Sequence, residues 1–336
     1  MNYNPLVSIC IPAYNSARWI GSTIQSALLQ TWKNKEIIIV DDGSTDNTLK
    51  IAKQFESDNL KVISQKNSGA CVARNKAFSI ANGDFIQWLD SDDLLAPDKI
   101  ENQINDGDSI LLPDVLHSSA FGQFHYRIKS ARFFPTSLWR DLSPIEWLLE
   151  HFNKGHWMYT AAWLVSRKLA DLAGPWDERL SRNQDGEYFT RVVALCREVK
   201  FHAGAKSYYR RANFSSITSN KFNNALKSVI LSKNLQVDTL LNLRDTKETR
   251  TACINCLQRA IFSYNLDSPS VRLVKKRIFE LGGTVTQPRG TAKFKAAEKI
   301  LGIKFARKIK DKLWFFNKLL QKYWEWFCSL LFRDSV

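Results

Sequence analysis

Three carboxylates stand close together in the stretch FIQWLDSDDLLAPDKI, residues 85–100, where an apolar run ends. In an extended chain, side chains two residues apart point to the same side, so Asp90 and Asp92 are predicted to share a face, with Asp93 pointing the other way. Two carboxylates without a nearby histidine or cysteine are typical ligands of a hard divalent cation such as Mg²⁺ or Mn²⁺. Diphosphate oxygens and water would complete its shell. Asp93 would cap the following segment or bind the chain around Pro97. The alternatives to a metal site are a helix cap and an ordinary acidic turn.

A second acidic pair, Asp41 and Asp42, follows an apolar run and precedes Gly43 in IVDDGSTDNT. A carboxylate in this position can accept hydrogen bonds from the imide of a nucleobase or from a ribose hydroxyl. Asp, Gly, Ser and Thr are also common in turns and caps, where they bond to nearby backbone. From these residues alone, ligand binding and a structural turn are equally well supported.

The elements that must position both pairs alternate along the first hundred residues. The pattern predicts strands over 6–14, 36–44, 60–65 and 84–90, and helices capped by Ser16 (17–30), from Ser44 or Thr45 to Phe55, and over 70–81. This order predicts an α/β fold with a mostly parallel, Rossmann-like sheet flanked by helices. Ligands of such sheets bind beyond the carboxyl ends of the strands, where both acidic pairs lie.

The remainder of the chain differs in kind from its beginning. Residues 106–215 mix strand and helix patterns and are predicted to complete the first domain, and 216–290 are predicted to form a helical C-terminal extension. Residues 291–336 are rich in Lys and Arg, with apolar residues at steps of three or four, which predicts a basic, aromatic amphipathic helix. Its lysines and tryptophans favour a membrane-surface anchor, and the alternative is a helix packed on the protein's own core.

The formal net charge of +15 over 336 residues predicts an anionic partner: nucleic acid, an anionic membrane or a phosphorylated substrate. Much of the excess lies in the C-terminal aromatic helix and no nucleic-acid-binding signature is present, so a basic nucleic-acid-binding or non-catalytic protein is only the alternative, and no nucleic-acid partner is expected. No G-x-G-x-x-G follows the first strand, which argues against a nicotinamide dehydrogenase. The chain shows neither a signal-peptide pattern nor a long apolar run. We therefore expect a cytoplasmic protein, peripheral at the inner face of the membrane.

Five motifs, in this order, resemble those of the family-two glycosyltransferases of GT-A fold. They are VSICIPAYN (7–15), EIIIVDDGSTDNT (36–48), NSGACVARNKA (67–77), FIQWLDSDDLLAPDKI (85–100) and WDERLSRNQDGEYFTRV (176–192). The resemblance covers about residues 1–215. It implies a nucleotide-sugar-binding half, 1–105, and an acceptor-binding half, 106–215. The implied activity is the inverting transfer of a sugar, usually from a UDP-sugar, to a hydroxyl of a glycan or lipid-linked glycan in cell-surface polysaccharide biosynthesis.

The resemblance also implies roles for single residues. The implied donor-binding residues are Pro12, Tyr14, Asn15, Asp41, Asp42, Gly69, Arg74, Asn75, Asp90 and Ser91. Within this set, Asp42 would bond the base and Asp41 would support its turn, while Arg74 and Asn75 would lie near the base or diphosphate. Asp90 and Asp92 match the metal-binding D-x-D motif, with Asp92 the stronger candidate for direct ligation of Mg²⁺ or Mn²⁺.

Asp185, in NQDGEY, matches the family's acceptor-activating base. Three carboxylates nearby compete with it for this role: Asp177, Glu178 and Glu187. The letters NQDG alone indicate only a turn, in which Asp is more often a cap than a base. The Q-x-x-R-W motif of processive synthases is absent, so we expect one sugar to be transferred per event.

Overall fold

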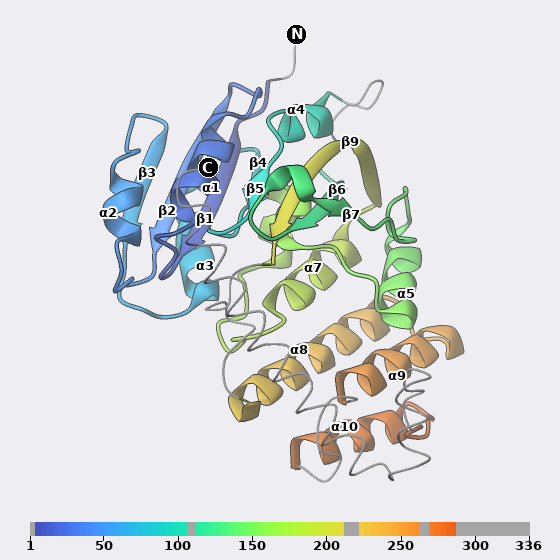
Figure 1. Cartoon of the computed structure of the whole chain (residues 1–336). Helices are drawn as coiled ribbons and strands as arrows, with labels where there is room; N and C mark the ends of the chain where they lie inside the picture. The colour runs from blue at the N-terminus through green and yellow to red at the C-terminus, as the bar shows by residue number, and fades with distance from the viewer. Residues whose placement is uncertain (1–3, 106–111, 212–221, 262–268, 287–336) are drawn as a thin grey trace. The chain divides into compact units, whose positions relative to one another are not determined.

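Figure 1 shows a computed structural model, which describes residues 4–105, 112–211, 222–261 and 269–286. Strands and helices alternate up to residue 88, as the sequence pattern predicts, and a further short strand precedes the next helix. These first elements are β1 (Val7–Ala13), α1 (Ile20–Leu28), β2 (Lys35–Asp41), α2 (Thr48–Lys53), β3 (Leu60–Ser64), α3 (Ala70–Ile80), β4 (Phe85–Trp88), β5 (Leu94–Leu95) and α4 (Lys99–Ile104).

The next hundred residues add strands to the same sheet and helices around it. They form β6 (Val115–Phe124), β7 (Arg132–Phe133), α5 (Pro144–Lys154), β8 (Trp163–Ser166), α6 (Arg167–Ala173), α7 (Gln184–Leu195) and β9 (Glu198–Arg210), with short 3₁₀ turns at Ile128–Ser130 and Thr160–Ala162. Three further helices follow: α8 (Phe222–Leu243), α9 (Lys247–Ile261) and α10 (Pro269–Glu280).

The strands lie in the order β3-β2-β1-β4-β8-β6-β9-β5, and β7 pairs with β6. Strands β1 to β4 are all parallel, and β1 and β2 are buried along almost their whole length, as expected for strands covered on both faces. Beyond β4, β8 runs antiparallel to both of its neighbours, while the long β6–β9 ladder is parallel. Most paired residues therefore belong to parallel ladders, and the predicted α/β class is confirmed.

The register of the parallel strands brings three strand ends to one edge of the sheet. Ala13 at the end of β1 pairs with Asp41 at the end of β2, and Cys10 pairs with Trp88 at the end of β4. The backbone N–H of Asp42 donates to the carbonyl of Ala13 at 2.8 Å, which continues the pairing past the strands. Both acidic pairs of the sequence are thus delivered to the same edge.

The predicted start of the first helix is wrong. Helix α1 begins at Ile20, and Ser16 does not cap it. The Ser16 hydroxyl instead bonds to the Tyr14 carbonyl at 3.1 Å and to the Ser91 hydroxyl at 2.7 Å. A partner 75 residues away has replaced the local one, which the local pattern could not reveal.

Helices α8, α9 and α10 lie next to one another, with α8 packed along α7 and α9 against α5 (Figure 1). Among the residues that the structure describes, no helix is both long and apolar enough to cross a membrane. The predicted amphipathic helix of residues 291–336 lies outside the described residues. The division of the chain at 215 and 290 stays a prediction.

Candidate active site

Asp42 fastens the end of β2 to the loop that leads into α3. Its Oδ1 accepts hydrogen bonds from the Gln65 side chain and the Ser68 N–H, both at 2.8 Å, and its Oδ2 accepts one from the Gly69 N–H at 2.8 Å. Gly69, with φ 102°, then begins α3. Asp42, which is predicted to bond the nucleobase of the donor, therefore also holds the loop that would border this nucleobase.

Asp41 and Asn15 shape the neighbouring turn. Asp41 is buried, and its Oδ2 accepts a hydrogen bond from the Ser44 N–H at 3.2 Å. Asn15, in a left-handed conformation with φ 48°, accepts one from the Thr45 N–H at 2.8 Å. A glycine is required at Gly43, where φ is 69° and a Cβ would lie 2.7 Å from the Asn67 nitrogen. The ends of β1 and β2 are thus held together by their own turns.

The segment from Asp90 to Asp93 is a turn, so the prediction of an extended chain with alternating carboxylates is wrong. The Asp93 N–H donates to the Asp90 carbonyl at 3.1 Å. From β9, the Arg210 N–H donates to Asp93 Oδ1 and its Nε to the Asp92 carbonyl, both at 2.7 Å. Asp93 is predicted to contact the chain around Pro97. In the structure it instead binds Arg210, which lies 117 residues further along the chain.

The turn nevertheless separates the three carboxylates as the sequence suggested. Asp93 is buried, whereas Asp90 and Asp92 are half-buried. Burial raises the pKa of Asp93 well above its usual value, and the nearby Asp92 and Asp90 carboxylates raise it further. Asp93 is a structural group, and the other two face outward from it. Ser91 between them is buried against Ser16.

Arg74 connects this turn to a distant part of the chain. Its Nη2 forms an ion pair with Asp90 Oδ1 at 2.6 Å, and its Nη1 donates to the Gln184 side chain at 2.7 Å. The guanidinium is buried and lies 4.4 Å from the centre of the Trp176 ring. Gln184 is the residue before Asp185. The Arg74 side chain therefore joins the acidic turn to the residue next to the predicted catalytic base.

Asp185 lies in the first turn of α7 and is half-buried. Burial raises the pKa of its carboxyl group, the Gly186 N–H lowers it, and Asp90, Arg74 and Lys233 are near enough to affect it by charge. Its side chain lines a cavity whose other walls are Trp147, His151, Trp157, Met158, Asn183, Gly186, Phe189 and Thr190. Aromatic walls beside a carboxylate suit the apolar faces and the hydroxyls of a sugar.

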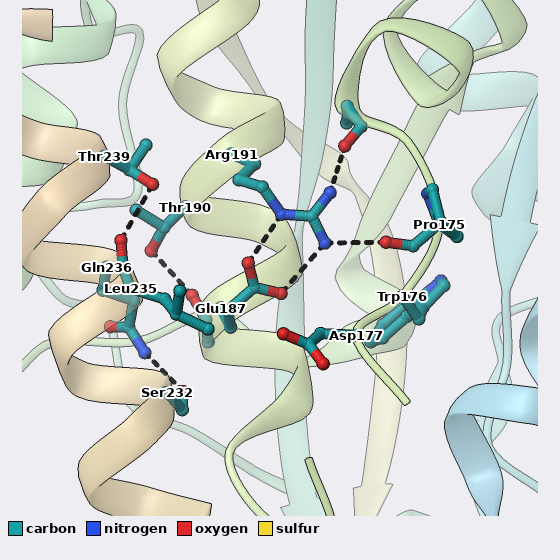
Figure 2. Close-up of polar contacts among 12 residues, drawn as sticks. Pro175, Trp176, Asp177, Glu187, Thr190, Arg191, Ser232, Leu235, Gln236 and Thr239 are labelled. Atoms are coloured by element: carbon teal, nitrogen blue, oxygen red, sulfur yellow. Dashed lines mark hydrogen bonds and ion pairs between the residues drawn. The ribbon is translucent and has the colours of Figure 1, made fainter. Parts of the chain in front are cut away.

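The three competing carboxylates face elsewhere. Asp177 forms an ion pair with Arg179 at 2.6 Å, and Glu178 accepts a hydrogen bond from Asn75 at 3.0 Å. Figure 2 shows Glu187 held by Arg191, whose guanidinium also donates to the carbonyl of Pro175 at 2.9 Å. These three line a different pocket from the one that contains Asp185. The structure therefore separates Asp185 from its neighbours in a way that the sequence alone could not.

Two predicted donor-site residues occupy structural positions. Asn75 exchanges two hydrogen bonds with the backbone of Trp176, at 2.8 and 3.0 Å, and so braces the loop before α7. Pro12 is buried within β1, opposite Val40. Tyr14, by contrast, is 48% exposed beyond the end of β1, where it could contact a ligand.

The described residues contain no group of three or more His, Cys, Asp or Glu side chains placed to hold a metal ion. Asp90 and Asp92 are nevertheless hard oxygen donors, and they stand in a turn where three acidic groups crowd together. Asp90 already shares one oxygen with Arg74. This donor set fits a divalent cation that takes its other ligands from a diphosphate and water, with Asp92 as the more direct ligand.

Several residues that build the site carry no sequence signal of their own. Arg210 holds the acidic turn, Gln184 receives Arg74, and Ser228 of α8 bonds to the loop before Asp185. Each of them acts on a partner tens of residues away. An alignment with related sequences could have marked them, whereas local composition could not.

The fold is that of the GT-A glycosyltransferases. A *Staphylococcus aureus* protein, TarS residues 1–349 in complex with UDP-GlcNAc, superimposes with a TM-score of 0.62 at 18% identity, covering 82% of this chain and 81% of that one. Residues 8–110 match the family model "Glycosyl transferase family 2". The resemblance to that family is thereby confirmed for this part of the chain, which contains four of the five motifs almost entirely.

Three relatives each match over little more than 100 residues. A glycosyltransferase of *Rickettsia typhi* described as uncharacterised is 47% identical over 103 residues, 31% of this chain and 32% of that protein. A putative teichuronic acid biosynthesis glycosyltransferase of *Bacillus subtilis*, TuaG, is 45% identical over 106 residues, 31% of this chain and 42% of that protein. The hyaluronan synthase of *Pasteurella multocida* is 47% identical over 103 residues, 30% of this chain and 11% of that protein. The match thus spans less than half of each relative.

Proposed function

We propose that this protein transfers a single sugar, with inversion, from a nucleotide sugar to a hydroxyl of a glycan or lipid-linked glycan. The observation that carries the proposal is the Arg74 bridge, which joins the acidic turn at Asp90 to the residue beside Asp185. A donor-side carboxylate and a candidate base are thereby fixed within one site. The expected donor is a UDP-sugar, and the expected setting is cell-surface polysaccharide biosynthesis.

The residues of the site support the chemistry of an in-line displacement at the anomeric carbon. Asp185 takes the proton from the acceptor hydroxyl, and its raised pKa makes it a stronger base than an exposed carboxylate. The aromatic walls around it hold the acceptor sugar and keep bulk water away from the reacting oxygen. Because one displacement suffices, no protein nucleophile is needed.

A divalent cation, Mg²⁺ or Mn²⁺, would be held by Asp92 and Asp90, and when bound it stabilises the charge that develops on the departing diphosphate. Arg74 keeps Asp90 oriented toward that position. The buried Asp93 and Arg210 keep the turn in shape without contacting the ligand.

The similar proteins agree with these choices. The TarS structures contain UDP-GlcNAc or UDP, which supports a uridine nucleotide, although the likeness in sequence is 18%. Two relatives carry names of polysaccharide synthesis, teichuronic acid and hyaluronan. We further propose a peripheral position at the inner membrane face, reached through residues 291–336.

A donor-hydrolysis and transfer assay tests the proposal. UDP-, GDP- and dTDP-sugars are offered with Mn²⁺, with Mg²⁺ or with EDTA, and release of the nucleoside diphosphate is measured with and without glycan acceptors. We expect release from UDP-sugars only, its loss in EDTA, and a product of inverted configuration by NMR. No release from any donor would refute the proposal, and a long polymer as product would refute single transfer.

A further inference from the structure

Helix α8 belongs to the region predicted as an extension, yet it touches the loop that carries the candidate base. The Ser228 hydroxyl accepts hydrogen bonds from the N–H groups of Ser181 and Arg182, both at 2.9 Å, and donates to the Arg182 carbonyl at 3.1 Å. A hydroxyl has one donor and two acceptor positions, so this hydroxyl is fully used by two residues of the loop.

Ser232, one helical turn further along α8, does the same for the next residue. Its hydroxyl donates to the Asn183 carbonyl at 2.7 Å and accepts from the Asn183 side chain at 2.6 Å and from Gln236 at 3.0 Å. Positions four apart lie on one face of a helix, so Ser228 and Ser232 meet the loop side by side. Together they fix the backbone from residue 181 to residue 183.

Asn183, which Ser232 holds, has an unusual backbone conformation. It has φ 54° and ψ 34°, a left-handed conformation rare for residues other than glycine, and its side chain does not cap α7. The side chain lies over Gly186, where an added Cβ would come within 2.8 Å of it. This turn sets the start of α7 and hence the position of Asp185, two residues later.

The α8 side chains that face this region form a buried polar stripe. Ser228, Ser232 and Gln236 are 5%, 0% and 0% exposed, and Gln236 bonds to the Lys233 ammonium at 2.9 Å. Figure 2 shows Ser232 and Gln236 on α8 beside Thr190 of α7. Apolar side chains would stabilise a helix interface as well or better, because buried hydrogen bonds add little net stability. The polar stripe is therefore better explained by the position it imposes.

We propose that Ser228 and Ser232 are positioning residues for Asp185, so that α8 is part of the catalytic apparatus of the transferase. The inference rests on the proposed function, in which Asp185 is the base. The two hydroxyls hold the 181–183 turn, and the turn aims the carboxylate at the acceptor hydroxyl. Neither serine is expected to contact the donor or the acceptor.

The test compares Ser228→Ala, Ser232→Ala and the double variant with the control Thr239→Val. The Thr239 hydroxyl lies on the same helix but bonds to the Leu235 carbonyl of α8 itself, at 2.9 Å (Figure 2). In hydrogen–deuterium exchange, the amides of Ser181 and Arg182, which donate to Ser228, should exchange about fivefold faster in Ser228→Ala and in the double variant, and unchanged in the control. The exchange measurement does not require the protein to be active as an enzyme.

In the kinetic arm, kcat for transfer should fall about 10- to 100-fold in the double variant, because a base displaced by about an ångström loses much of its effect. The dissociation constant for UDP and the KM for the donor should stay within about twofold of wild type. The acid limb of the kcat–pH profile should move to lower pH, since a loosened loop admits water to Asp185. A purely structural role would not move that limb.

The outcomes separate the two proposals. A wild type that releases no nucleotide from any donor overturns the proposed function and the inference with it. A wild type that transfers sugar, with a folded double variant whose kcat is unchanged, overturns the inference alone, as does unchanged exchange of the Ser181 and Arg182 amides in that variant. Should the double variant fail to fold, the single Ser228→Ala variant, which keeps Ser232, decides by the same comparison.

Discussion

At the scale of single residues, Asp185 is set apart by its surroundings. It faces an aromatic-walled cavity, whereas Asp177, Glu178 and Glu187 line another pocket and bond to Arg179, Asn75 and Arg191. We predict that Asp185→Asn lowers kcat at least about 10²-fold, the usual contribution of a positioned base. Calorimetric titration with UDP should show donor binding unchanged. Turnover close to that of wild type would remove Asp185 from the mechanism.

The pH dependence follows from the same side chain. Burial raises the pKa of Asp185, with Asp90 raising it and Arg74 and Lys233 lowering it by charge. The base must be deprotonated to act, so kcat should decrease as pH falls through a pKa above the ordinary carboxyl value. His151 in the same cavity, with a pKa lowered to about 3 mainly by burial, stays neutral there. A kcat–pH profile with its acid limb at or below the ordinary value would contradict this.

The acidic turn yields a contrast between adjacent residues. Asp92→Ala should abolish cation-dependent donor binding and cost less stability than the change at Asp93, because Asp92 is half-buried and the variant keeps the Asp92 carbonyl that accepts from Arg210. Asp93→Ala removes the buried acceptor of the Arg210 N–H and should cost about 1–3 kcal/mol of unfolding free energy. Titration with UDP and Mn²⁺, alongside urea unfolding, measures both. If the two variants behaved alike in both measurements, the separate roles of Asp92 in binding and of Asp93 in stability would be wrong.

At the scale of elements, α7 is anchored at both ends. The loop before its first turn is held by α8, and Arg191 in its second half bonds to the Ala173 carbonyl. Figure 2 shows Arg191 bonded also to Glu187 and to the Pro175 carbonyl. Helix α7 therefore connects the loop after α6 to the helices that follow the sheet.

We predict that Arg191→Met costs about 3 kcal/mol of unfolding free energy, because it leaves the buried Glu187 carboxylate without its partner. The double variant Glu187→Gln, Arg191→Met should recover part of that loss. The exposed pair Arg250–Asp245 provides the control, since Arg250→Met should change stability far less. Urea unfolding of the four proteins decides, and equal losses at Arg191 and Arg250 would contradict the prediction.

The elements also show where sequence patterns suffice. The runs that form β1 and β2 are apolar because both faces of each strand are buried, so they could be predicted directly. The turn at Asp90–Asp93 and the start of α1 could not, because Arg210 and Ser91 determine them from 75 residues or more away. The carboxylates of the candidate site could be proposed from motifs. Gln184, Ser228 and Ser232, which contact Arg74 or the loop before Asp185, carry no such motif.

At the scale of the whole molecule, the basic C-terminal segment carries the remaining prediction. Residues 291–336 lie outside the described residues, and their sequence predicts an interfacial helix with lysines beside aromatic side chains. Deleting them should abolish sedimentation with vesicles containing anionic lipid while leaving hydrolysis of a soluble donor intact. If the shortened protein still sedimented with the vesicles, residues 291–336 would not be the membrane contact.

The two hydroxyls of α8, on Ser228 and Ser232, have a consequence for recombination between related transferases. A chimaera joined just after β9 would take the candidate base from one parent and α8 from another, so the bonds of Ser228 and Ser232 to the loop before Asp185 would be lost wherever the second parent has other residues there. Such a graft could keep both the nucleotide pocket and the acceptor cavity intact and still be slow. The unit that can be exchanged between relatives therefore runs through α8, well past the last strand of the sheet.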